Sequence, residues 1–201
     1  MKILYSIFIL ILISYVQVFP QSKYVLKCRN NILKISELIS LAEVGTIEKG
    51  RTNSGDAGKY LKCVGLKKGE PYCAAGQYYC FAEAVKFLHL TVLSIPIKRT
   101  GNANLMFEDA IHRGIKSRYV INEHDLIVWR KGKSRSGHIE RVIIPGKAGW
   151  ATTVGFNVRK YDNLSKKYVE GVFLMRRNIY EPLQRMRVRG IIGFAVIKGR
   201  N

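Results

Sequence analysis

The spacing of apolar residues changes part-way along this chain of 201 residues, and that change constrains the fold more than any other feature. Up to residue 113, apolar residues recur at helical spacing. The helices expected there cover residues 32–48, 57–64, 73–90 and 105–113. Beyond residue 125, strand-like runs bounded by turns cover residues 126–130, 138–144, 150–159, 171–176 and 191–198. Helices followed by strands predict an α+β fold, with N-terminal helices packed on a C-terminal antiparallel β-sheet.

The N-terminal segment indicates export. Lys2 is followed by an uncharged run that extends to Ser22, and residues 7–13 are all Ile, Leu or Phe. A positive start and an apolar run of this length are typical of a secretory signal peptide. Residues 1–22 are therefore predicted to be a signal peptide or, if uncleaved, a signal anchor, which would be the chain's only membrane contact. A single domain is expected over residues 24–201, secreted to the periplasm or the exterior.

The net charge indicates an anionic partner. Lys and Arg number 34 against 14 Asp and Glu, which gives a formal charge of +20. Basic residues gather in the turn before His138 and near the C-terminus: Lys131, Lys133, Arg135, Arg176, Arg177, Arg185, Arg187 and Arg189. Such a field favours anionic polymers of a cell envelope, although charge runs are often only solvated surface. Export argues against nucleic acid, and the sequence has no zinc, helix-turn-helix or RNA-binding pattern.

The cysteines separate into different roles. There are four, and their spacings fit no zinc motif, so no metal site is predicted. An even number allows disulfides in an oxidising compartment, and a Cys28–Cys63 link is one pairing. Cys80 follows Cys73 by two helical turns and is expected in the core. Cys73 itself opens an apolar helix after a turn, where free N–H groups and the helix dipole favour a thiolate. A buried structural cysteine would also fit that position.

A histidine and an asparagine follow on strands. His138 comes directly after Gly137 at the start of a strand, from which an imidazole can reach toward a helix terminus. A Cys–His pair needs this geometry because the imidazole accepts the thiol proton. Asn157 lies on the next strand and can accept a hydrogen bond from the other ring nitrogen, as the third member of a triad does. Each residue alone also fits an ordinary surface role.

The order of these residues resembles the CHAP family, the cysteine, histidine-dependent amidohydrolases/peptidases of the papain-like superfamily. The similarity extends over about residues 42 to 195. It also includes Val44–Glu48 with Asn53-Ser54-Gly55, Lys59-Tyr60-Leu61 before Gly69–Ala75, Asp125–Arg130, and Arg189–Phe194. The chain departs from the family at Gly155-Phe156-Asn157, which lacks the usual carboxylate, and at Glu140, where a small residue is usual.

The resemblance implies a papain-like fold and hydrolysis of an amide bond in peptidoglycan, without metal or cofactor. It assigns Cys73 as nucleophile, His138 as base and then acid, and Asn157 as the residue that orients His138. Glu140 is expected either to orient His138 or to contact substrate. Tyr72 and Trp150 are expected on the substrate side, Tyr72 as a contributor to the oxyanion hole.

Three alternatives remain open at the level of sequence. The departures around Asn157 also fit an inactive peptidoglycan-binding module. A papain-like protease acting on proteins would use the same residues. Charge alone suggests a nucleic-acid binder.

Overall fold

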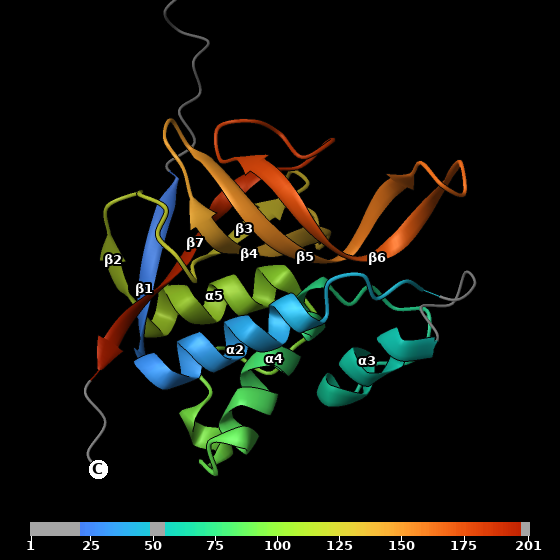
Figure 1. The fold of residues 1–201 in the computed structure, drawn as a ribbon. Helices are drawn as coiled ribbons and strands as arrows, with labels where there is room; N and C mark the ends of the chain where they lie inside the picture. Colours follow the sequence, from blue (N-terminus) through green and yellow to red (C-terminus); the bar gives the residue numbers. More distant parts are fainter. Residues whose placement is uncertain (1–20, 49–54, 198–201) are drawn as a thin grey trace, which may run out of the picture.

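The computed structural model describes residues 21–48 and 55–197 (Figure 1). Its helices are α2 (Asn30–Ala42), α3 (Gly58–Val64), α4 (Cys73–Phe87) and α5 (Ala103–Arg113), with 3-10 turns η1 (Gly55–Ala57) and η2 (Val92–Ser94). Its strands are β1 (Ser22–Arg29), β2 (Ile115–Ser117), β3 (Leu126–Arg130), β4 (Gly137–Pro145), β5 (Trp150–Asp162), β6 (Lys167–Asn178) and β7 (Arg187–Ile197). The chain is therefore α+β, as the change of period predicts.

All the described strands join one sheet of seven, in the order β2-β1-β7-β3-β4-β5-β6. Strands β3 to β7 correspond to the predicted ones: β3 has the predicted bounds, β4, β5 and β6 are longer, and β7 begins four residues earlier. The prediction of a purely antiparallel sheet is wrong, because β1 pairs with β7 in parallel. Strand β1 was not expected, and it begins at Ser22, the last residue of the predicted signal peptide. Residues 1–20 lie outside the described residues.

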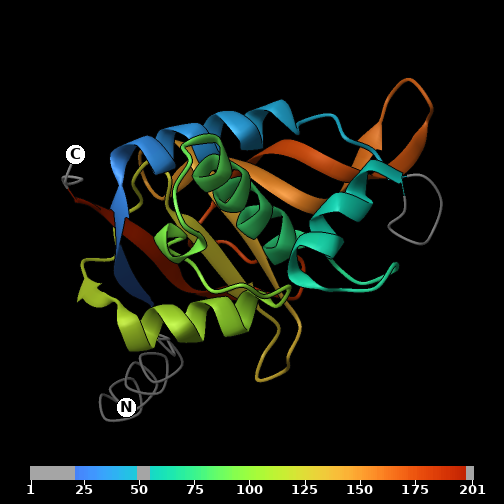
Figure 2. The ribbon, with the colours of Figure 1, turned by 90° about the horizontal axis from the view of Figure 1, so that it is seen from below.

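The helices cover one face of the sheet, and α4 lies in the middle of that layer between α2 and α5 (Figures 1 and 2). The core between the layers includes Phe81, Met106, Phe107, Val128 and Ile139, all nearly or fully buried. The opposite face carries a smaller core, which includes Ile127, Trp129, Ile179, Val188 and Ile191. No helix within the described residues is long and apolar enough to cross a bilayer.

Helix α4 approaches the sheet very closely at one glycine. A Cβ built on Gly76 would lie 2.2 Å from the ring of Phe156, which is fully buried in β5. Only glycine allows this separation, so the first turn of α4 is held directly against the strands. This contact matters for the site, because Cys73 lies in the same turn.

Helix α2 is shorter than predicted. It ends at Ala42, and Gly45 then adopts a φ of 98° that turns the chain toward the sheet. Gly45 N–H donates to Val172 O, and Ile47 pairs with Gly171 of β6. The apolar residues of 44–48 are therefore used to reach a strand and not to continue the helix.

An ion pair in the interior attaches β1 to the rest of the sheet. Lys23 Nζ lies 2.5 Å from Asp125 Oδ2 and donates to Val120 O at 2.9 Å. Both side chains are almost fully buried. Burial raises the pKa of Asp125 to about 6 although the Lys23 ammonium opposes that rise. Residue 23 is thus part of the folded domain.

Candidate active site

Cys73 is the first residue of α4, and its thiol borders a cleft. The turn before it is fixed by Tyr72 N–H, which donates to Asn157 Oδ1 at 3.1 Å. The Sγ atom lies 4.0 Å from Gly137 O, at the start of β4. The cleft has a volume of about 500 Å³, and its lining includes Cys73, Leu66, Pro71, Asn102, Arg135 and Gly137. The sulfur is largely buried but borders a space that could hold part of a ligand.

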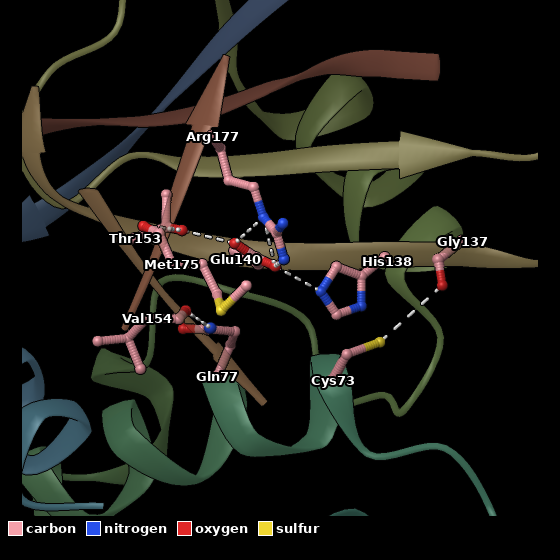
Figure 3. Close-up of polar contacts among 9 residues, drawn as sticks. All are labelled: Cys73, Gln77, Gly137, His138, Glu140, Thr153, Val154, Met175 and Arg177. Atoms are coloured by element: carbon pink, nitrogen blue, oxygen red, sulfur yellow. Dashed lines mark hydrogen bonds and ion pairs between the residues drawn. The ribbon is translucent and has the colours of Figure 1, made fainter. Parts of the chain in front are cut away.

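His138 lies across from this sulfur. It is the second residue of β4, and its Nε2 lies 2.9 Å from Glu140 Oε1. Figure 3 shows the other ring nitrogen facing the Cys73 sulfur. The ring also lies beside the indole of Trp129, with centroids 6.0 Å apart. Cys73 and His138 therefore meet, as the sequence predicts.

Glu140 fixes the imidazole and is itself fixed on every side. Arg177 donates to it from Nε at 2.9 Å and from Nη2 at 2.6 Å, and Thr153 Oγ1 donates at 2.5 Å (Figure 3). Its strand partner is Gly155, where a Cβ would lie 2.9 Å from the carboxyl carbon. Glu140 is completely buried, so of the two roles expected for it the structure supports orientation of His138 and not contact with a substrate.

Asn157 does not contact His138, and its predicted place as the third member of the triad is wrong. A β-bulge between Gly155 and Val158 interrupts the alternation of β5, and Asn157 has a φ of 57°. Its amide is turned away from β4, where it accepts from Tyr72 N–H and donates to Glu48 Oε1 at 3.3 Å. Asn157 therefore holds the turn before Cys73 and leaves the imidazole to Glu140.

The two remaining expectations also fail. The Tyr72 side chain is fully buried and stacks on Tyr60 at 5.4 Å between ring centroids. Its N–H is already donated to Asn157, so neither group is available for an oxyanion. Trp150 begins β5 at the end remote from the site, because Ala151 pairs with Pro145 whereas Gly155 pairs with Glu140. Its ring is covered by the guanidinium of Arg176 at 4.5 Å.

Arg177 and Thr153 belong to the site but carry no local signal in the sequence. Arg177 stands in a basic run, and Thr153 follows another threonine. They reach Glu140 because β4, β5 and β6 are adjacent in the sheet, and that register becomes visible only in the fold.

The electrostatics favour the charged forms of both His138 and Glu140. Burial by itself lowers the pKa of His138, but its contacts with Cys73 and Glu140 outweigh burial and raise the pKa to about 9. Burial likewise opposes the charged form of Glu140, yet His138 and Arg177 lower its pKa to about 2. The imidazole is thus favoured in its protonated form at neutral pH, and its second ring nitrogen faces the Cys73 sulfur.

The other cysteines are unsuited to this chemistry. All four cysteines are thiols, so the Cys28–Cys63 disulfide does not occur in the structure. Burial raises the pKa of Cys28 to about 12 and that of Cys80 further. Cys80 is fully buried, which confirms its expected place in the core.

One group of residues in the described part of the chain has the composition of a metal site but not its electrostatics. It consists of Glu37, Glu123 and His124. His124 Nδ1 lies 2.7 Å from Glu37 Oε2 and 3.2 Å from Nη2 of the buried Arg141. A metal cation would lie beside that guanidinium, so we assign no metal to this group.

Comparison with known proteins adds no relative. No protein-family model matches the sequence, and no curated protein or solved structure matches the chain.

Proposed function

We propose that the protein is a secreted, cysteine-dependent amidohydrolase with a papain-like fold, related to the CHAP family, which cleaves an amide bond in peptidoglycan. The observation that carries the proposal is the arrangement of Cys73, His138 and Glu140: a thiol at a helix N-terminus faces an imidazole that a buried carboxylate orients. This is the combination of nucleophile, base and orienting group that acyl transfer needs. The basic surface fits an anionic envelope substrate.

In the reaction, the Cys73 thiolate attacks the carbonyl carbon of the amide. The C–N bond breaks, and the amine leaves with the proton that His138 carries. Water then attacks the thioester carbon and gives a proton to His138. The C–S bond breaks, a carboxylic acid leaves, and the Cys73 thiolate and protonated His138 are restored. The N–H of Cys73 lies in the first turn of α4, where backbone donors have no helical partner and suit a developing oxyanion.

The orienting carboxylate weakens the case for an inactive binding module. That alternative rested on the departures around Asn157. Because Glu140 contacts His138 at 2.9 Å, the chain needs no carboxylate near Asn157. The cut bond is either the muramoyl–L-alanine amide or a peptide bond of the stem or cross-link.

The test is digestion of purified peptidoglycan, followed by mass spectrometry of the muropeptides. The wild type should release new amine ends, and Cys73→Ala should lower the rate by more than about a thousandfold. Cys80→Ala is the matched control, because that thiol lies in the core and not at the cleft. Equal digestion by Cys73→Ala and wild type would refute the proposal. Cleavage of casein without cleavage of peptidoglycan would instead identify a protein-directed protease.

A further inference from the structure

The end of α4 that is remote from Cys73 carries a protruding apolar surface. Phe87, Val92 and Leu93 are 68%, 65% and 91% exposed. They belong to the segment of residues 86–99, which we call the apolar tip. Pro96 and Ile97 of the same segment are buried and hold it against the core. The outward residues therefore contribute little to folding, and contiguous exposed apolar groups on a soluble domain commonly mark an interaction surface.

The charged residues of the segment itself all have one sign. Residues 84–99 contain no Asp or Glu, whereas Lys86, Lys98 and Arg99 are all exposed. Outside the segment, Glu83 lies 3.6 Å from Lys86 in an exposed ion pair, and Asp109 pairs with Arg113, which donates to Pro96 O. Apolar side chains that project between lysines and arginine form the pattern of segments that lie in the headgroup region of a membrane.

The position of the tip suits contact with a flat surface. In Figure 1 the segment forms the lower edge of the molecule, on the side away from the sheet, and in Figure 2 it faces the viewer. Helix α4 has 15 residues, so Phe87 lies about 21 Å along the helix from Cys73, whereas the chain after Arg99 returns to the cleft, which Thr100 lines.

A groove adjoins the tip and has a matching polarity. Its volume is about 620 Å³, and its lining includes Tyr78, Val85, Leu90, Ile95, Lys86 and Arg99. Apolar walls with basic residues at the edge suit an amphiphile with an anionic head. Arg99 is held in place by a hydrogen bond from Nε to Cys63 O at 3.0 Å.

From these observations we propose that the apolar tip docks on an anionic lipid bilayer, with Phe87, Val92 and Leu93 inserted among the headgroups and Lys86, Lys98 and Arg99 on the lipid phosphates. A bilayer receives projecting side chains without a complementary shape, whereas a protein partner would need a hollow that fits them. The inference is independent of the proposed hydrolase activity and of any membrane contact by residues 1–22.

The experiment measures insertion at the tip itself, so that binding through residues 1–22 does not mask it. Tryptophan is introduced in the full chain as Leu93→Trp, and the matched control is Leu164→Trp, at a residue that is 96% exposed in the β5–β6 turn. Emission is recorded with vesicles of phosphatidylglycerol and phosphatidylcholine, and with phosphatidylcholine alone. The wild-type signal of Trp129 and Trp150 is subtracted. The Leu93→Trp emission should shift to shorter wavelength and be quenched by brominated lipid, only with the anionic vesicles.

Charge and apolar variants complete the test. In the Leu93→Trp background, Lys86→Glu with Lys98→Glu should weaken vesicle partition at the tip by at least about tenfold. Lys166→Glu with Lys167→Glu, the same change of charge in the β5–β6 hairpin, should weaken it less. Phe87→Ser with Val92→Ser should also weaken vesicle partition at the tip by at least about tenfold. No shift for Leu93→Trp, an equal shift for Leu164→Trp, or an equal shift on phosphatidylcholine would each overturn the proposal.

Discussion

At the scale of single residues, Cys73 and then Glu140 favour the protonated form of His138. Replacement by Gln in Glu140→Gln keeps the shape but removes the charge that favours imidazolium. We expect the pKa of His138 to fall from about 9, and kcat of the proposed hydrolysis to fall by about a hundredfold or more. The pKa is measured by NMR titration of the ring carbon-bound protons, and kcat by release of amine ends.

Asn157→Ala provides the comparison for Glu140→Gln. The wild-type Asn157 side chain contacts Tyr72 and Glu48 but not the imidazole. Its removal should therefore leave the His138 pKa near that of the wild type. If Asn157→Ala lowered this pKa as much as Glu140→Gln does, the assignment of Glu140 as the orienting residue would be wrong.

His138 also gives the stability a defined dependence on pH. Its pKa is higher in the folded state than the ordinary value of 6.5, so its contribution is complete below pH 6.5 and is lost as pH rises through about 9. Glu140 has a pKa of about 2, so it stays charged over the pH range in which His138 loses its proton. The difference in unfolding free energy between wild type and His138→Gln should therefore shrink, by at most about 3 kcal/mol, between pH 6 and pH 9.5. Urea unfolding measures it, and a constant difference would contradict the ion-paired imidazole.

The residues of the site were not equally predictable from sequence. Cys73 and His138 each stand at a recognisable local feature, a turn before a helix and a glycine before a strand. Asn157 was predicted to orient His138, and this prediction was wrong, because it depends on the bulge between Gly155 and Val158. A bulge changes which face a side chain takes, and here nothing in the sequence marked it.

At the scale of elements, the attachment of β1 depends on Lys23. Removal of one partner from a buried ion pair leaves an uncompensated charge, which costs about 3–5 kcal/mol. Lys23→Met should therefore lower the free energy of unfolding by that amount, as measured in urea. Lys27→Met in the same strand is the control, since Lys27 is exposed. Equal stability of the two variants would show that Lys23 does not hold β1 in place.

Strand β1 shows what a pattern of apolar residues cannot reveal. It directly follows a long uncharged run, and it buries Lys23 on the face that alternation shares with the exposed Lys27 and not with the buried Leu26 and Cys28. The partner carboxylate, Asp125, is about a hundred residues away in the chain, so the sequence gives no reason to bury Lys23. Helices α2 to α5 and strands β3 to β7 were predicted with the correct type and order, whereas the short and exposed strand β2 was not expected.

At the scale of the whole molecule, the fold reduces the number of cations available to an anionic polymer. Arg141 is buried, Arg177 is bound to Glu140, and Arg189 is paired with Glu108 at 3.0 Å. Lys131, Lys133 and Arg135, in contrast, are exposed in the β3–β4 turn, and Arg135 also lines the cleft beside Cys73. The charge that guides a substrate to the site should therefore come mainly from this turn.

This placement predicts a salt-dependent step before catalysis. Binding of the inactive Cys73→Ala variant to purified walls should weaken as NaCl rises from about 0.05 M to about 0.5 M, because salt screens exposed charges. Lys131→Glu with Lys133→Glu should lower both the binding at low salt and its dependence on salt. Lys166→Glu with Lys167→Glu changes the net charge equally but at a distant hairpin, and should have less effect. If the two pairs were equivalent in a sedimentation assay, total charge and not the β3–β4 turn would govern approach to the wall.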